Sequence, residues 1–374
     1  MYDVAITGGG LAGLALSIQI IRLGYTVILF EKEQYPFHKV CGEYISLESW
    51  DFLNELGVDL DGIKVPIINK LQLSAVNGKL LEQPLPLGGF GISRYKLDNT
   101  LVQIARAEGV VILENTKVSD IRFSGDEFII DTSRQQYRAK LVAGSYGKRS
   151  NIDIKWKRRF SLAAKNKLNN YIGVKYHIKT DFRADTIALH NFKNGYCGIV
   201  KIEENLYNLC YLTTANNLKK SKGDIHEMER VILSQNPFLK KLFTDSTIIF
   251  PAPLTISQIS FDKKSQVEDH VLMIGDAAGM ITPLCGNGMS MALHGSKIAA
   301  GLIPEFLQKN ISREEMEKKY SGQWKKQFAH RLKMGRRIQR LFGSKWLSNL
   351  MITMIKPFPK LINYLVRQTH GKTF

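Results

Sequence analysis

One short stretch near the N-terminus limits the folds open to this chain more than any other. An apolar run, YDVAIT (Tyr2–Thr7), leads into the glycine-rich segment GGGLAG (8–13), which an amphipathic helix pattern and a second apolar run, TVILFE (26–31), follow. Apolar residues at helical spacing between two short apolar runs predict a strand, a tight turn, a helix and a strand. This order is typical of a nucleotide-binding α/β domain.

The glycines of this turn have the spacing G-x-G-x-x-G through Gly8, Gly10 and Gly13. Gly8 would allow the tight turn, Gly10 would let the backbone approach a pyrophosphate, and Gly13 would let the helix pack closely on the sheet. The pyrophosphate would then lie at the positive N-terminus of the helix. Glu31, at the end of the second strand, is placed to accept hydrogen bonds from an adenosine ribose, with Lys32 beside it as a further contact. This pattern alone leaves NAD and FAD open.

A second segment bears on the choice of cofactor. Residues 270–303 contain an apolar strand that ends at Gly275 and Asp276, a loop with proline and glycine, and a helix rich in small residues. A short carboxylate at a strand end can reach a chain of hydroxyl groups. Backbone N–H groups of Gly286, Gly288 and Met289 would stand at the N-terminus of the next helix, where they suit an electron-rich ring that becomes anionic on reduction.

This second segment resembles the second FAD signature of flavoproteins of the para-hydroxybenzoate hydroxylase and geranylgeranyl reductase superfamily. The resemblance implies that FAD is the cofactor, that Asp276 holds its ribityl chain and that the following loop holds the pyrimidine edge of the flavin. Residues 90–121 resemble the Arg-x-x-Leu helix of the family and the strand after it. Arg94 would contact the flavin, and the backbone of Val118 would contact the adenine.

The segment PFHKVCGEY (36–44) brings together a histidine, a cysteine and a glutamate. Two ligands three positions apart, His38 and Cys41, do not complete a metal site, so we expect no metal here. The segment resembles the K-x-C-G-E/G stretch that reductases and some monooxygenases of the superfamily place beside the isoalloxazine ring, which implies that Lys39, Cys41 and Gly42 lie nearest that ring. Cys41 is the candidate catalytic residue, as a proton donor or a substrate-orienting thiol; the alternative is a small side chain that packs beside the flavin.

At one position the chain departs from the family. Residues 141–153 match the central segment G-A-D-G-x-x-S through Gly144, Gly147 and Ser150, but Tyr146 stands where the family has aspartate. In aromatic hydroxylases of this type, that aspartate helps to organise both flavin and reduced nicotinamide. NAD(P)H is the expected electron donor, although this position gives it less support.

The order of these motifs predicts an α/β fold. We expect a Rossmann-like, three-layer FAD-binding domain from residues 1–65, 93–150 and 263–310. An inserted antiparallel β-sheet substrate domain would come from residues 66–92 and 151–262, and residues 311–374 would form a basic helical C-terminal segment. Four runs with strand-like alternation fall within 171–213. Residues of these runs that could line a substrate pocket, or fill a core, are Phe192, Tyr196, Cys197, Cys210 and Tyr211.

The positive charge of the chain is concentrated at its end. Of a net charge of +18, residues 311–374 supply +12, from 15 Lys and Arg against three Glu. Three interpretations are open: helices packed on the FAD-binding domain with a solvated basic side, a face that lies on an anionic membrane surface, and a nucleic-acid site, which we set aside because no recognition module accompanies the charge.

The absence of paired cysteine spacing and of a signal-peptide pattern predicts a cytoplasmic protein, peripheral on the inner face of the membrane under the second interpretation of the basic segment. No apolar run is long enough to span a bilayer.

Together these features predict an FAD-dependent oxidoreductase that acts on an aromatic or lipophilic small molecule. An NAD(P)H-driven monooxygenase is favoured, because GYCGIVKIE (195–203) lacks the tryptophan and the proline with which geranylgeranyl reductases hold an isoprenoid. The W-x-W-x-I-P motif of flavin halogenases is also absent. The alternatives are a geranylgeranyl-reductase-like enzyme that reduces carbon–carbon double bonds of an isoprenoid or lipid, and a non-catalytic flavin-binding protein.

Overall fold

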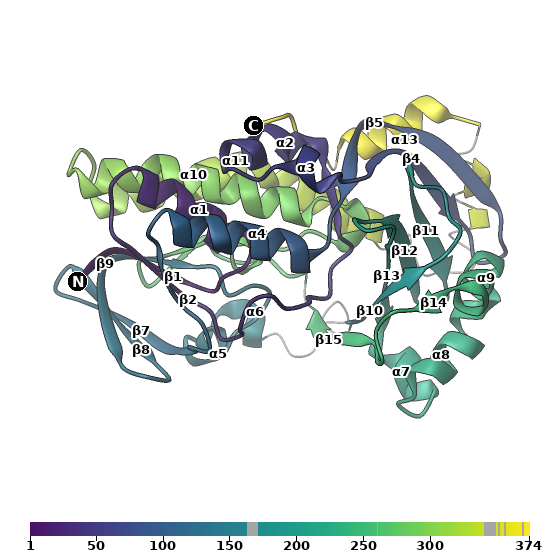
Figure 1. Ribbon diagram of the computed structural model, residues 1–374, viewed down its shortest axis with the longest axis horizontal. Helices are drawn as coiled ribbons and strands as arrows, with labels where there is room; N and C mark the ends of the chain where they lie inside the picture. Colours follow the sequence, from purple (N-terminus) through teal and green to yellow (C-terminus); the bar gives the residue numbers. More distant parts are fainter. Residues whose placement is uncertain (163–170, 260, 340–348, 351, 355–356, 369) are drawn as a thin grey trace.

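Two β-sheets organise the structure into two lobes that lie side by side (Figure 1). The computed structural model describes residues 1–162, 171–259, 261–339, 349–350, 352–354, 357–368 and 370–374. The α/β fold expected from the sequence is confirmed: one sheet has a parallel centre under helices, and the other is an almost entirely antiparallel insertion.

The first sheet is parallel at its centre, where β1 lies between β2 and β9. On one side β17 pairs with β9, and on the other side β6 pairs with β2. The apolar runs that predicted β1 and β2 are buried, as expected for parallel strands covered on both faces. β7 and β8 continue from β9 as antiparallel strands. The bounds are β1 (Tyr2–Thr7), β2 (Val27–Phe30), β6 (Val111–Leu113), β7 (Val118–Ser124), β8 (Glu127–Thr132), β9 (Gln136–Gly144), β16 (Val267–Glu268) and β17 (Val271–Met273).

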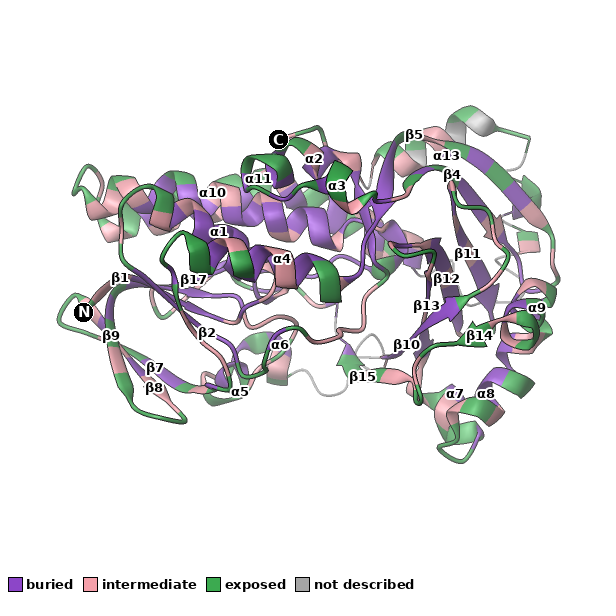
Figure 2. Cartoon of the chain, viewed as in Figure 1, coloured by how far each residue is buried: buried purple, intermediate pink, exposed green. Residues whose placement is uncertain are grey.

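Helices cover this sheet, and the buried positions concentrate between them and the strands (Figure 2). The basic helix α11 takes part in this packing, because Met316, Tyr320, Trp324 and Phe328 are buried at a spacing of one turn. α11 is therefore part of the fold, as the first interpretation of the basic segment expects. The helices of this lobe are α1 (Leu11–Arg22), α2 (Trp50–Glu55), α3 (Leu60–Ile63), α4 (Arg94–Ala107), α5 (Asn151–Lys155), α6 (Arg159–Leu162), α10 (Gly288–Leu307) and α11 (Arg313–Gln339).

The second sheet is built from two separate passages of the chain, β3–β5 and β10–β15. The four strand-like runs predicted within 171–213 are confirmed as β10–β13. One pairing differs from the antiparallel expectation: β11 runs parallel to β4, because the two strands come from different passages and no hairpin joins them. The bounds are β3 (Tyr44–Ser46), β4 (Ile67–Ser74), β5 (Leu80–Gly91), β10 (Tyr171–Lys179), β11 (Thr186–Phe192), β12 (Gly195–Lys201), β13 (Tyr207–Thr214), β14 (Thr247–Ile248) and β15 (Leu254–Ile259).

Short helices flank the second sheet. They are α7 (Ala215–Lys220), α8 (Ile225–Val231), α9 (Pro237–Asp245) and the C-terminal α13 (Pro359–Arg367), which packs beside β5. Among the described helices, none is both long and apolar enough to cross a membrane.

Candidate active site

The glycine turn places two cations beside the start of α1. A side chain at Gly13 would put its Cβ 2.2 Å from the carbonyl oxygen of Gly8, so only glycine lets α1 pack this closely on the turn. A Cβ at Gly10 would lie 3.6 Å from Nη2 of Arg94 and 4.0 Å from Nζ of Lys39. No side chain of the described residues caps this end of α1. Two cations and an uncapped helix N-terminus together form a surface suited to an anion.

Arg94 and Lys39 are held in place by one buried carboxylate, that of Asp98. Arg94 donates to both oxygens of Asp98 at 2.8 Å, and Nζ of Lys39 donates to Oδ2 at 2.9 Å. Burial opposes the ionisation of Asp98, but Arg94 and Lys39 hold the pKa of this carboxyl below its ordinary value. Two cations share one anion, so the cluster keeps a net positive charge beside the glycine turn.

The other predicted contacts near the first two strands lie in different surroundings. Glu31 is buried at the end of β2, and its carboxylate accepts from the backbone N–H of Gly9 at 2.9 Å and of Glu33 at 3.1 Å. Lys32 is exposed and forms an ion pair with Glu33 at 3.5 Å. Val118 begins β7 and is half-buried. The structure thus brings Glu31 to the glycine turn and leaves Lys32 in solvent.

The loop with Cys41 is tied to the second lobe through a fully buried carboxylate. Glu43 forms an ion pair with Lys175, accepts from the backbone N–H of Arg94 at 2.8 Å, and lies 2.7 Å from Nε2 of His177. Burial opposes the ionisation of Glu43, but Lys175 and His177 keep the pKa of its carboxyl below the ordinary value. The sequence prediction missed Lys175 and His177; their alternation with apolar residues along β10 was the available signal.

Cys41 and Gly42 lie between the two charged clusters just described. Burial raises the pKa of the Cys41 thiol above its ordinary value, although the guanidinium of Arg94 acts in the opposite direction. The thiol is therefore protonated near neutral pH. A Cβ added to Gly42 would meet no atom within 4 Å, so this part of the loop borders open space.

His38 has aromatic neighbours. Its ring stacks on Tyr95 at a centroid distance of 4.5 Å and meets the ring of Phe250 at 4.6 Å. Among the described residues, no group of three or more His, Cys, Asp and Glu side chains could hold a metal ion.

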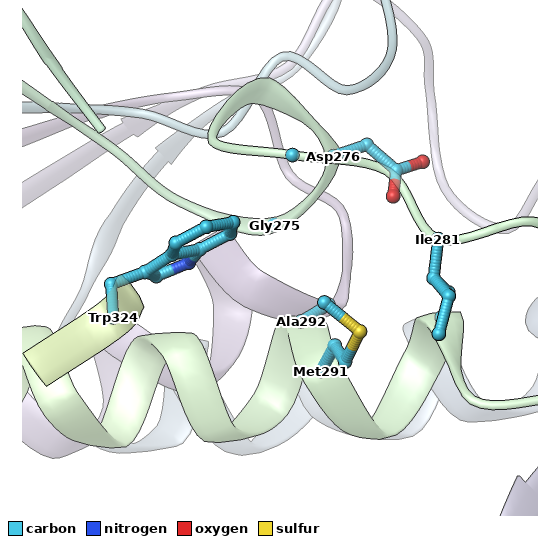
Figure 3. Close-up of a pocket in the computed structure, with 8 residues that line it drawn as sticks. Gly275, Asp276, Ile281, Met291, Ala292 and Trp324 are labelled. Atoms are coloured by element: carbon cyan, nitrogen blue, oxygen red, sulfur yellow. The ribbon is translucent and has the colours of Figure 1, made fainter. Parts of the chain in front are cut away.

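The second predicted signature lies against α1. Gly275 has a φ of +60°, and a Cβ there would approach Cβ of Ala12 at 3.1 Å. The next residue, Asp276, is half-buried, and burial raises the pKa of its carboxyl against the opposing effect of Lys264 and Arg94. Figure 3 shows Asp276 and Gly275 on the loop above α10, in a pocket that Trp324 of α11 also lines.

The loop between this signature and α10 turns through Gly286, whose φ is +64°. A Cβ at Gly286 would lie 3.0 Å from the ring of Tyr44, so the loop packs directly on β3. Gly288 and the buried Met289 are the first two residues of α10. Backbone N–H groups at this end therefore stand where the positive pole of a long helix begins.

Tyr146, at the position where the family has aspartate, reaches a buried ion pair. Its hydroxyl donates to Oδ1 of Asp153 at 3.2 Å, and Arg158 donates to the same oxygen at 2.8 Å. Both side chains of this pair are 1% exposed. The family has an aspartate at position 146. Here Tyr146 occupies that position, and its hydroxyl contacts the carboxylate of Asp153 from α5.

The five side chains proposed as pocket lining do not share one face of the second sheet. Phe192, Cys197 and Tyr211 are buried in an apolar core against α8 and α9, on the side away from the glycine turn, so lining is wrong for these three. Strand alternation puts Tyr196 and Cys210 on the opposite face. Tyr196 belongs there to an apolar cluster with Leu212, Phe261, Met280 and Leu284, of which Met280 and Leu284 lie in the loop after Asp276.

Comparison with known proteins shows the family to which the first 309 residues belong. A family model described as an FAD binding domain matches residues 1–309. The chain is 27% identical over 373 residues to conditioned medium factor receptor 1 of Dictyostelium discoideum, covering 89% of this chain and 69% of the relative. It is 24% identical over 352 residues to the digeranylgeranylglycerophospholipid reductase of Thermoplasma acidophilum, covering 87% of this chain and 84% of the relative.

Among solved structures, the flavin-dependent brominase Bmp2 has a similar fold. The two structures superpose with a TM-score of 0.79 at 19% identity, covering all of this chain and 94% of the brominase. At this identity the likeness concerns the fold.

Proposed function

The chain belongs to the family of proteins that carry this FAD binding domain, within the FAD-dependent oxidoreductases, and from this premise we propose that it reduces carbon–carbon double bonds of a lipophilic substrate. The observation that carries the proposal is the position of Cys41 between two buried charge clusters, where burial also raises the pKa of its thiol. Double-bond reduction needs a proton donor beside the flavin, whereas hydroxylation by a flavin does not require a thiol.

The residues present fit FAD. Arg94 and Lys39 beside the uncapped N-terminus of α1 suit a pyrophosphate, and the carboxylate of Glu31 at the same turn suits a ribose. The side chain of Asp276 suits the hydroxyl groups of the ribityl chain, and the N-terminus of α10 suits the pyrimidine edge. Bound FAD, once reduced, would supply a hydride to one carbon of the double bond.

Cys41 would supply the second hydrogen. Its Sγ would give a proton to the other carbon, and this proton together with the hydride that bound reduced FAD would supply accounts for the two hydrogens gained by the substrate. The thiolate formed faces the positive charge of Arg94, which stabilises it until a proton returns from water. Glu43, fixed by Lys175 and His177, holds the Cys41 loop against the second lobe during this step.

Two further observations favour reduction over the monooxygenase preferred on sequence grounds. The reductase of Thermoplasma acidophilum aligns with 87% of this chain. Tyr146 also replaces the aspartate that organises nicotinamide in the hydroxylases. We propose NAD(P)H as the ultimate electron donor. Because Tyr146 replaces the aspartate, direct reduction of the flavin by NAD(P)H should be slower than in those hydroxylases.

Hydroxylation is the second candidate, and one observation favours it. The apolar cluster of Tyr196, Leu212 and Phe261 meets Met280 and Leu284 between the second sheet and the FAD signature. Apolar packing of this kind would keep water away from that side of the site, which hydroxylation by a flavoenzyme requires.

An oxygen-free experiment separates the two reactions. The purified protein, with its flavin reduced chemically under argon, is mixed with isoprenoid lipids that contain double bonds. We expect the flavin absorbance to return on mixing, because the double bond accepts the electrons. Return of the absorbance only after air is admitted would contradict the proposal; an oxygenated lipid formed at that stage would then indicate hydroxylation, and no product would indicate a flavin-binding protein without turnover. A purified protein without flavin would overturn both reactions.

A further inference from the structure

The end of the chain combines positive charge with exposed large apolar side chains. Residues 318–374 contain 14 Lys and Arg and no Asp or Glu. Within the described part of this segment, four large apolar side chains are exposed by 39–61%: Leu350, Met354, Phe358 and Tyr364. Soluble proteins seldom expose such side chains in one short stretch unless a partner covers them.

These side chains are mounted on the rest of the fold by the opposite side of the segment. Ile362 of α13 is 4% exposed and packs with Ala75, Leu81 and Ile352. Asn363 accepts a hydrogen bond from Gln83 of β5 at 3.1 Å. Because the side of α13 that carries Ile362 is used for this attachment, Tyr364 on the same helix is held facing solvent.

Two exposed cations, Lys360 and Arg367, lie on α13 with Tyr364, and Phe358 is the residue just before this helix. We define the C-terminal face as the set Leu350, Met354, Phe358, Lys360, Tyr364 and Arg367. We propose that the C-terminal face docks on the surface of an anionic bilayer, with Phe358, Met354 and Tyr364 entering the interface and the cations contacting lipid phosphates.

The charge and the apolar side chains of the segment together favour an anionic bilayer over other partners. A second copy of the same face would bring like charges together, which opposes association. A nucleic acid would satisfy the cations but would leave exposed aliphatic side chains such as Leu350 and Met354 without apolar partners. An anionic bilayer satisfies both kinds of side chain.

A cavity of about 890 Å³ lies next to the C-terminal face. Val366 and Arg367 of α13 line one part of it, and Tyr44 lines another. The hydroxyl of Tyr44 is buried without a hydrogen-bond partner among the described residues, and its ring lies against Gly286 of the predicted flavin loop. If the proposed reduction is correct, on which this step rests, docking places the cavity where a lipophilic substrate can pass from the bilayer toward Tyr44.

Co-sedimentation with vesicles tests the docking directly, without reference to catalysis. The full chain with its flavin is mixed with vesicles of phosphatidylcholine alone and of phosphatidylcholine with phosphatidylglycerol, at low and high salt. We expect binding to the anionic vesicles that weakens with salt, and much weaker binding to the neutral ones. Equal binding to both compositions, or none to either, would overturn the proposal.

Two double variants locate the surface. Lys360→Glu with Arg367→Glu should weaken binding to anionic vesicles by about 25-fold or more, since each cation near such a surface contributes about fivefold. Phe358→Ser with Tyr364→Ser should weaken it by about tenfold or more, because two rings no longer enter the interface. Matched controls are Lys219→Glu with Lys220→Glu on α7, and Leu23→Ser with Ile154→Ser, which alter exposed residues elsewhere.

Each outcome for the variants has a defined meaning. Losses confined to the C-terminal face, with flavin content unchanged, support the proposal. Equal losses in the control variants would contradict it. Tight binding of an oligonucleotide by a protein that does not bind vesicles would also contradict it. Vesicle binding by a protein that reduces no double bond would leave the docking surface intact and contradict only the proposed reaction.

Discussion

The carboxylate of Glu43 and the ammonium group of Lys175 form an ion pair in which neither side chain is exposed to solvent. Glu43 comes from the loop that carries Cys41, and Lys175 comes from β10 in the other lobe. His177, also on β10, lies 2.7 Å from the second carboxylate oxygen. This contact fixes the loop with the candidate catalytic thiol relative to the sheet that would cover the substrate.

Removal of the Glu43 charge should be costly because it leaves Lys175 buried without a counter-ion. We expect Glu43→Gln to lower the free energy of unfolding by about 3–5 kcal/mol. The double variant Glu43→Gln with Lys175→Met should recover most of that loss, since no charge is then buried alone. Urea unfolding of the three proteins measures both values, and a double variant as unstable as Glu43→Gln would show that the ion pair is not the cause.

The same carboxylates predict how stability depends on pH. The pKa values of Glu43 and Asp98 lie below those of the unfolded chain, so the folded state binds fewer protons than the unfolded state in acid. Their stabilisation is complete above about pH 5 and is lost as pH falls through about 4 toward the folded pKa values. Unfolding free energies measured between neutral and acidic pH should fall less steeply for Glu43→Gln than for the unaltered protein; parallel curves would exclude Glu43 as a contributor.

Two glycines of the predicted cofactor site should respond differently to the same substitution. Gly13→Ala would place a methyl group 2.2 Å from a backbone oxygen, so we expect a loss of about 3 kcal/mol or more and reduced flavin content. Gly42→Ala meets no atom within 4 Å and should leave stability unchanged. Melting temperature and flavin absorbance report on both, and a stable, fully loaded Gly13→Ala protein would contradict the close packing of α1 on the turn.

Lys39 should contribute to FAD affinity through its charge. Lys39→Met leaves Asp98 paired with Arg94 but removes one of the two cations beside Gly10. One charge-assisted hydrogen bond contributes about 1.5–3 kcal/mol, so the Kd for FAD should rise by about tenfold or more. Titration of flavin fluorescence gives the Kd, with Lys219→Met on α7 as the exposed control; equal Kd values for the two variants would remove Lys39 from the site.

Cys41 should affect turnover more than flavin binding. If its thiol donates the proton, Cys41→Ala should slow double-bond reduction by about a hundredfold or more while FAD remains bound. Cys197→Ala, at a buried cysteine on the far side of the second sheet, is the control for loss of a thiol. Rapid-mixing measurements of flavin reoxidation by substrate provide the rate. An unchanged rate in Cys41→Ala would show that the thiol only packs beside the flavin.

Local patterns predicted the parts of the structure that local chemistry determines. The glycine turn, α1 and the first two strands follow from apolar spacing and from glycine positions within one short stretch. β10–β13 likewise follow from alternation between turn residues. In each case the residues that interact lie within one element or its neighbours in the sequence.

The remaining features depend on contacts between distant residues. Glu43 meets Lys175 across 132 positions, and neither residue type indicates the other in advance. The parallel pairing of β11 with β4 depends on how two passages of the chain meet. Sequence patterns placed Cys197 and Cys210 in one candidate lining set; their opposite faces follow from the register of β12 with β13, and alternation could not indicate which face would receive α8 and α9. The ion pair of Arg94 with Asp98 could have been predicted from the sequence, because residues four positions apart on a helix lie on the same side of it.

The mass of the product formed without oxygen distinguishes double-bond reduction from hydroxylation. The reduced protein is incubated under argon with an isoprenoid lipid, and the lipid is then analysed by mass spectrometry. We expect a product with two more hydrogens for each double bond reduced, in amounts that match the flavin oxidised. A product that forms only in air and carries an added oxygen atom would contradict it.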